Sequence, residues 1–377
     1  MVVLIFFAPP PPDTKFNVVP LLPLYGHAAL KARLRDTVHR GALPSSLLLQ
    51  GARGVGKQQV ALWLGRLLLC ENSNRPDAPC GECKTCRMTA ELQHPDLHWF
   101  FPRERLKGNS DPDLDDIRGD IAEGIAERMQ NGGVYERSAG DQGIFVATIR
   151  ALVQTASMSP AMAKRKVIVI GDAEHMVVQE GSDQAANAFL KLLEEPPADT
   201  TIILTSSEPG ALLPTIRSRV VAVRVAPLSD REVEAFLGDS TVASQIDSGS
   251  GRTDELVRLA GGAPGRVVGY GAWKTALTNA ERLLEAASAP DRGRRMRVSL
   301  AQGGAGARGK FTDTLEALTV LLHDRARAAA TNGDTRAASG AAQAMDAVEH
   351  AKERAYGNVN PQLITASLLR QIAPLVG

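Results

Sequence analysis

The sequence has few aromatic residues, no excess of either charge and no hydrophobic run of membrane-spanning length. Only 4% of its 377 residues are aromatic, and 43 Lys and Arg balance 42 Asp and Glu, which leaves a net charge of +1. A chain with so little net charge has no overall positive field to attract nucleic acid. Any contact with DNA must therefore be local or shared with partner subunits.

The most apolar segment is the eight-residue run MVVLIFFA at the N-terminus, which a proline run follows. A membrane-spanning helix needs about 20 apolar residues, and a secretory signal begins with a charged region that this segment lacks. We therefore predict that residues 1–22 are unstructured or wrongly assigned. We also expect a cytoplasmic protein without membrane contact, with a length that suggests two or three domains.

Cysteine is absent from the chain except within the segment 70–86, which holds Cys70, Cys80, Cys83 and Cys86. In a reducing compartment this clustering indicates a metal site rather than disulfides. Four thiolates suit tetrahedral zinc, and the two short C-x-x-C steps supply ligands from a tight turn. An iron–sulfur cluster accepts the same ligands, and a set of free thiols is the weaker alternative. We favour structural zinc.

Apolar strands alternate with amphipathic helices over the first part of the chain. We expect strands over residues 46–50, 97–101, 166–172, 200–207 and 220–225, and helices over 57–69, 149–156 and 183–195. This alternation predicts an α/β domain with a parallel sheet covered on both faces. The polar segment 103–143 is predicted to be an exposed insertion. After Pro227 only helical patterns remain.

A phosphate-binding loop follows the first strand, because GARGVGK fits the pattern G-x-x-x-x-G-K with Gly51, Gly54, Gly56 and Lys57. Such glycines let backbone N–H groups face an anion at a helix N-terminus, and the lysine reaches the outer phosphates. The next position should be the Ser or Thr that binds magnesium, and it is Gln58. We predict a P-loop fold without efficient hydrolysis, in which ATP with magnesium is a candidate ligand of a degenerate site.

The acidic element of the site shows a similar loss. Asp172 closes the strand 166–172, where P-loop proteins place the carboxylate on the magnesium side. Ala173 follows it and provides no base to orient an attacking water. We interpret Glu174 as a solvated acid at a helix start. Thr205 ends the next strand, where this fold reads the nucleotide, and here we expect it to satisfy backbone groups.

Further motifs occur along the chain: HPD at 94–96, NAFLKLLEEPP at 187–197, TSSEPGALLPTIRSR at 205–219, GAPGR at 262–266 and NVNPQL at 358–363. Together with the P-loop and the cysteine segment, they resemble the bacterial DNA polymerase III clamp-loader family of AAA+ proteins. The resemblance implies an AAA+ domain over residues 23–226, a helical lid over 227–270 and a helical collar over 271–377. The collar would carry assembly contacts through apolar faces such as Leu315, Leu318 and Leu322.

Two subunit types of that family share these motifs, the ATP-hydrolysing gamma/tau type and the delta-prime type. Three departures favour delta-prime: Gln58, Ala173, and Gly265 where gamma/tau carries a nucleotide-sensing arginine, with Arg266 one place late. The resemblance also implies an arginine finger, Arg219, that acts in trans on a neighbour's ATP. Val220 replaces the cysteine of the family's Ser-Arg-Cys motif, and the nearby Arg217 is an alternative finger.

The resemblance therefore implies a delta-prime subunit in a hetero-oligomer with the gamma/tau and delta subunits, which loads the sliding clamp onto primed DNA. Such a chain would be a component of a DNA-directed DNA polymerase with no ATPase activity of its own. A gamma/tau-type ATPase that tolerates Gln58 is one alternative. A zinc-stabilised nucleotide-binding module outside replication is another.

Overall fold

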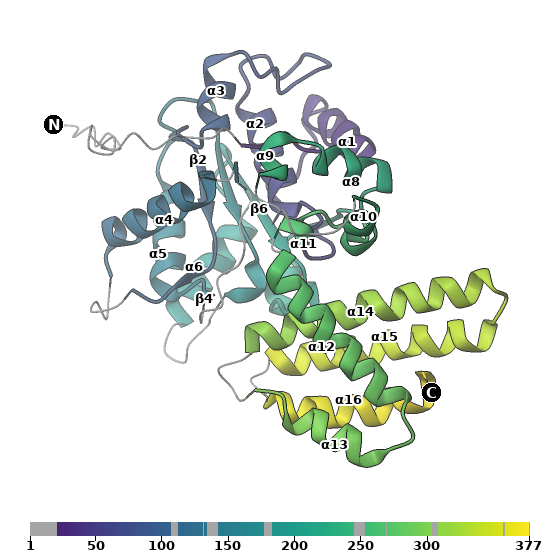
Figure 1. The fold of residues 1–377 in the computed structure, drawn as a ribbon. Coiled ribbons are helices and arrows are strands. Elements are labelled where there is room, and N and C mark those ends of the chain that lie inside the picture. Colours follow the sequence, from purple (N-terminus) through teal and green to yellow (C-terminus); the bar gives the residue numbers. More distant parts are fainter. Residues whose placement is uncertain are drawn as a thin grey trace. The chain divides into compact units, whose positions relative to one another are not determined.

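The computed structural model describes residues 21–106, 112–130, 132–133, 142–176, 183–244, 253–268, 270–303, 308–356 and 359–376. These residues form two compact units, one up to residue 268 and the other from residue 270. Figure 1 shows the helices and strands of the chain.

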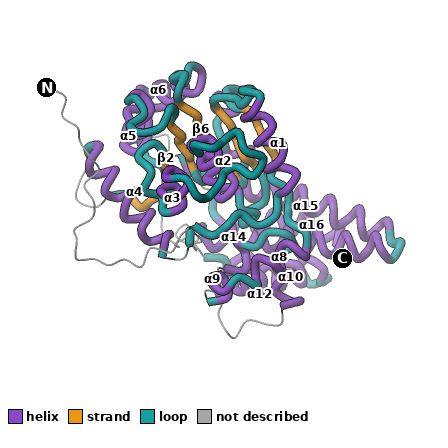
Figure 2. The backbone as a smooth tube through the Cα atoms, turned by 90° about the horizontal axis from the view of Figure 1, so that it is seen from above, coloured by secondary structure: helices purple, strands orange, loops and turns teal. Residues whose placement is uncertain are grey.

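A parallel sheet of five strands forms the centre of the first unit, in the order β2-β5-β6-β1-β7. Its strands are β1 (Ser46–Gln50), β2 (Leu97–Phe100), β5 (Lys166–Ile170), β6 (Thr200–Ser206) and β7 (Val221–Arg224). A two-stranded antiparallel pair, β3 (Arg103–Glu104) with β4 (Gln142–Gly143), lies outside this sheet. Figure 2 shows strands in orange among the helices and loops. Every pair of neighbouring strands in the five-stranded sheet is parallel, and the predicted parallel sheet is confirmed.

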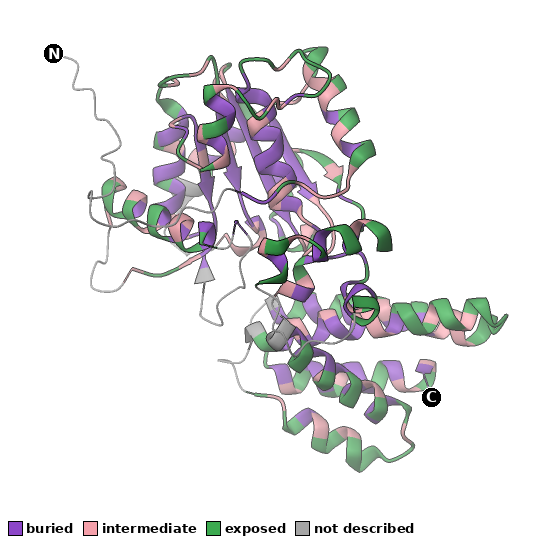
Figure 3. Ribbon diagram, turned by 45° about the horizontal axis from the view of Figure 1, so that its top comes forward, coloured by how far each residue is buried: buried purple, intermediate pink, exposed green. Residues whose placement is uncertain are grey.

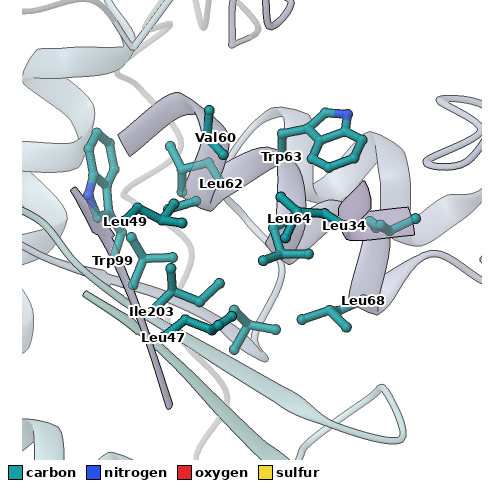
Figure 4. Packing of buried hydrophobic residues seen from close by; sticks show 14 of the residues in the cluster. Leu34, Leu47, Leu49, Val60, Leu62, Trp63, Leu64, Leu68, Trp99 and Ile203 are labelled. Carbon is teal, nitrogen blue, oxygen red and sulfur yellow. The ribbon is translucent and has the colours of Figure 1, made fainter. Parts of the chain in front are cut away.

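Helices cover both faces of the sheet, because successive strand residues point to opposite faces. Leu47, Leu49 and Ile203 pack on α1 (Ala28–His39) and α2 (Lys57–Leu69), as Figure 4 shows. Leu48 and Ile202 point the other way, toward a second cluster. That cluster includes α4 (Leu114–Met129), α5 (Val146–Ser157), α6 (Asp183–Glu194) and α7 (Pro214–Arg217). The inner strands are buried along almost their whole length (Figure 3), which explains the apolar residues at their centres.

The predictions for residues 103–143 and for residues 1–22 need correction. Within 103–143, α4 begins at a capping box formed by Asp113 and Asp116, and it buries Ile117, Ile121 and Met129. The predicted exposed insertion therefore contains a packed helix. The apolar residues of α4 recur at helical spacing, so they form one face that packs against the sheet. Leu21 and Leu22, at the end of the predicted unstructured segment, are buried as well. The rest of that segment, 1–20, lies outside the described residues.

The same compact unit also contains short helices. Between the strands lie α3 (Lys84–Ala90) and the 3-10 turns η1 (Ala173–His175) and η2 (Pro209–Ala211). After the last strand come α8 (Asp230–Leu237), α9 (Ser240–Ala243), α10 (Thr253–Ala260) and α11 (Gly265–Val268). Ser229 caps α8 in a reciprocal box with Glu232, as the Ser-x-x-Glu spacing favours.

The second unit is a bundle of helices: α12 (Tyr270–Ser288), α13 (Arg292–Leu300), α14 (Arg308–Thr331), α15 (Thr335–Tyr356) and α16 (Pro361–Val376). Leu315, Leu318 and Leu322 are completely buried inside this bundle. The prediction that these side chains contact other subunits is therefore wrong, since helices of the same chain cover them. No helix in the described part of the chain has both the length and the apolar character to cross a membrane.

Candidate functional site

The P-loop connects β1 to α2 with the backbone that its glycines predict. Gly54 and Gly56 have φ values of 80° and 94°, which favour glycine. Gly51 has no room for a side chain, because a Cβ there would lie 2.4 Å from Val225 O. On the outer side of the loop, His27 Nε2 lies 3.0 Å from Val55 O. The loop thus has the shape of a phosphate-binding loop, in the predicted place.

Lys57, the lysine of the P-loop, is 5% exposed and is held inside the loop. Its Nζ donates to Gly51 O at 3.0 Å, to Ala52 O at 2.9 Å and to Ser207 Oγ at 2.8 Å. An ammonium group has three N–H donors, and these three acceptors are enough to occupy them. A phosphate would have to compete with the acceptors for this lysine.

Gln58, at the position of the magnesium ligand, faces the edge of the sheet. Its Oε1 accepts a hydrogen bond from Trp99 Nε1 at 3.0 Å and one from Arg128 NH1 at 3.4 Å. Arg128, from α4, is 8% exposed, and its guanidinium stacks on Phe101 at 3.4 Å from the ring centroid. A cation that approached Gln58 Oε1 would meet this guanidinium, and like charges repel. The oxygen is therefore poorly placed to bind magnesium.

Glu174 is not the solvated acid that the sequence suggested. The residue is only partly exposed and its Oε2 is buried, while its Oε1 accepts the Ser207 N–H at 3.0 Å. Burial, and then the charge of Asp172, raise the pKa of Glu174, although the charge of Lys57 opposes the shift. The correction has a geometric cause, since the η1 turn directs this side chain toward the end of β6 rather than into solvent.

Asp172 and Thr205 lie together at the carboxyl ends of β5 and β6. Thr205 Oγ1 accepts the backbone N–H of Asp172 at 3.1 Å, so the threonine satisfies a backbone group, as expected. Asp172 has a φ of 47°, an uncommon value for a residue other than glycine. The structure thus brings the sequence-predicted residues of the nucleotide site together at one end of the sheet.

The helix that begins at Gly265 packs directly on the P-loop. Gly265 N donates to Gly54 O at 2.9 Å, and a Cβ on Gly265 would lie 2.8 Å from Gly54 Cα. Both residues must therefore be glycine for the two backbones to approach this closely. The contact joins the start of α11 to the P-loop at Gly54.

The four cysteines come together between α2 and α3. Their Sγ atoms lie within 4.8 Å of one another, with pairs at 3.7 and 4.0 Å, and none of the four forms a disulfide. Tetrahedral zinc with Zn–S bonds of about 2.3 Å requires S–S separations of about 3.8 Å, so the donor set fits zinc. N–H donation by Cys83 lowers the pKa of Cys80 to about 6 although burial opposes it, whereas burial raises the pKa of Cys86.

Arg219 lies at the end of α7 with its guanidinium engaged by its own chain. Its Nε donates to Glu194 Oε1 at 2.6 Å, and its NH1 donates to Thr215 O at 2.8 Å. Glu194 belongs to the LLEEPP motif, so the two family motifs meet here. Arg219 is about a quarter exposed and Glu194 about half exposed, and such a pair can exchange partners.

A family model described as DNA polymerase III, delta subunit matches residues 26–229, more than half of the chain. This chain belongs to that family. It is 31% identical over 217 residues to DNA polymerase III subunit delta' of Pseudomonas aeruginosa and 29% identical over 223 residues to that of Escherichia coli. Each alignment covers 58% of this chain and 52% of the relative, so the chain spans about half the length of these curated relatives.

Members of a related group match as well. The gamma/tau subunit of Mycobacterium tuberculosis is 26% identical over 250 residues, which cover 66% of this chain and 36% of the relative. A solved structure of a gamma subunit-related protein from Thermotoga maritima gives a TM-score of 0.40 at 18% identity and covers 91% of this chain and 100% of that one.

Two residues with clear roles were not found from the sequence. Arg128 lies in the segment interpreted as an exposed insertion, and only the packing of α4 brings it to Gln58. Asp96, in the HPD motif, is 1% exposed and accepts backbone N–H bonds from Ala161, Met162 and Ala163. The motif was visible in the sequence, but its partners lie 65 to 67 residues away.

Proposed function

We propose that this chain is a delta-prime-type subunit of a DNA polymerase III clamp loader that does not hydrolyse ATP. Membership of the family supports the clamp-loader assignment. The orientation of Gln58 carries the argument against hydrolysis, because its oxygen accepts from Trp99 and Arg128. Ala173 at the position of the base and the internally bonded Lys57 point in the same direction.

ATP turnover by the purified chain tests this proposal against the gamma/tau alternative. We expect no turnover above background with magnesium-ATP, and the same value for Lys57→Ala. Turnover that Lys57→Ala abolishes would show that the chain is an active ATPase. Calorimetry with ATP, with and without magnesium, measures binding separately, and we expect no gain in affinity from magnesium.

The proposed role in the assembly is to present Arg219 to the ATP of an adjacent subunit. A guanidinium at that place neutralises charge on the transferred phosphoryl group. In this role Arg219 would exchange Glu194 for a phosphate, since both are anionic oxygen acceptors. The proposed partners are the gamma/tau and delta subunits, with the sliding clamp and primed DNA as the substrates of the whole complex.

Reconstitution with purified gamma/tau and delta subunits tests the finger. We expect Arg219→Ala to lower clamp-loading ATPase at least tenfold, with assembly by gel filtration unchanged. Arg217→Ala, an exposed arginine two residues away, is the matched control and should retain most activity. An Arg219→Ala complex with full ATPase would refute the role, and loss with Arg217→Ala instead would assign the finger to that residue.

We further propose that the four cysteines hold one structural zinc ion. The thiolate separations and the absence of an open position support zinc bound by protein ligands alone. The ion would tie the loop 70–83 to α3. The cysteine segment also contacts α1, because Arg35 Nε donates to Ala78 O at 2.6 Å. This bond links the proposed zinc site to the face of the sheet that α1 and α2 cover. Metal analysis should give about one zinc per chain, and iron in its place would indicate the cluster alternative.

A further inference from the structure

The helical bundle of the second unit leaves four large apolar side chains in solvent. Met296 and Leu300 on α13 are each 56% exposed, Leu363 on α16 is 66% exposed, and Val359 is 37% exposed. Within the described part of this unit, no other large apolar side chain reaches such exposure. Met296 and Leu300 are four residues apart and therefore share one face of α13.

These side chains belong to one region of the surface because the start of α16 is bonded to the end of α13. Gln362 Nε2 donates to Leu300 O at 3.0 Å and to Gln302 O at 3.1 Å. Leu363 directly follows Gln362, and Val359 lies three residues before Gln362. We call Met296, Leu300, Val359 and Leu363 the α13–α16 patch.

The charged residues on the two helices of this patch are all basic. Helices α13 and α16 contain five arginines and no acidic residue: Arg292, Arg294, Arg295, Arg297 and Arg370. Arg294 pairs with Glu285, and Arg297 pairs with Asp291, both outside the two helices. Arg292, one turn before Met296 on the same face, has no side-chain partner among the described residues. The patch is thus apolar in part and positive in part.

We propose that the α13–α16 patch binds an acidic amphipathic helix of another protein chain. Exposed Leu and Met side chains gain free energy by burial against an apolar face, and the arginines gain by pairing with carboxylates. Duplex DNA would satisfy the arginines but would leave the apolar side chains in water. A second copy of this chain would bring arginines against arginines, which costs free energy.

A binding experiment with the full chain tests this chemistry. The probe is a fluorescein-labelled 20-residue helical peptide with Leu on one face and Glu on the others, and fluorescence anisotropy measures its affinity. We expect Leu363→Ser with Met296→Ser to weaken binding about tenfold, and Arg292→Glu with Arg370→Glu to weaken it by a similar factor. All four side chains are exposed, so these variants should keep the thermal stability of the parent chain.

Matched controls distinguish binding at the patch from nonspecific attraction between the acidic peptide and any exposed arginine. Arg327→Glu with Arg336→Glu reverses two exposed arginines on α14 and α15 and should leave the affinity unchanged. A peptide of equal charge without the Leu face should bind at least tenfold more weakly. Equal binding of that peptide, no binding of the amphipathic one, patch-dependent binding of a 20-base-pair DNA duplex, or self-association that Leu363→Ser abolishes in sedimentation would each overturn the proposal.

Discussion

Asp96→Asn should destabilise the first unit because one buried carboxylate anchors a whole loop. Asp96 Oδ1 accepts from Ala161 N at 2.5 Å, and Oδ2 accepts from Met162 N at 2.8 Å and Ala163 N at 2.6 Å. Lys166 Nζ holds the end of α5, where this loop begins, by donating to Thr155 O and Met158 O. The change to Asn preserves the shape of the side chain, so no cavity contributes to the effect.

The size of the effect follows from the three hydrogen bonds. Bonds to a charged group contribute about 1.5–3 kcal/mol each. Asparagine removes the negative charge from all three hydrogen bonds. Its side-chain NH₂ group also faces at least one backbone N–H, and two donors cannot bond to each other. Ala161 and Met162 are exposed, so water replaces part of what is lost. We therefore expect the free energy of unfolding to fall by about 3–4 kcal/mol, and the melting temperature by about 10 °C.

Urea unfolding followed by tryptophan fluorescence measures this change, and amide hydrogen exchange at residues 161–163 locates it. Asp36→Asn is the matched control, because Asp36 is exposed and makes only a surface ion pair with Arg40, which should cost less than about 1 kcal/mol. A change for Asp96→Asn no larger than that of the control would refute the anchoring role.

Three further outcomes are expected. Burial raises the pKa of Glu174 above its usual 4.5, so the folded chain binds its proton more tightly than the unfolded chain, and stability falls as pH rises from 4.5 through the folded pKa. Glu174→Gln should therefore be more stable than the parent at pH 7.5 but not at pH 4 in urea unfolding, and an equal difference at both pH values would contradict this. Gly265→Ala places a Cβ against Gly54 Cα and should cost about 1–3 kcal/mol, with faster hydrogen exchange in α11. Gly119→Ala, where a Cβ meets nothing within 4 Å, should not destabilise. Equal effects of the two substitutions would show that the close approach of Gly265 to Gly54 does not require glycine. Cys86→Ser should release zinc, measured by atomic emission, and lower the melting temperature, whereas an unchanged metal content would exclude Cys86 as a ligand.

Local sequence was sufficient for much of this protein. The alternation of strands and helices predicted the parallel sheet, because strands buried on both faces must be apolar throughout. Glycine spacing predicted the P-loop, since the φ values of Gly54 and Gly56 suit glycine. Ser229 begins α8 as its N-cap, the position that serine favours. In each case the individual strand, loop or helix start is specified by residues within a few positions of it.

The tertiary structure decided the chemistry of the site. Arg128 reaches Gln58 across 70 residues of sequence, Glu174 turns inward to Ser207, and Arg219 pairs with Glu194. Leu315, Leu318 and Leu322 found partners in their own bundle, whereas Met296 and Leu363 did not. Periodicity shows that a face is apolar, but only packing shows what covers it. The sequence by itself therefore determined the fold and the family, and the structure decided which of its charged and apolar groups remain free to meet another chain.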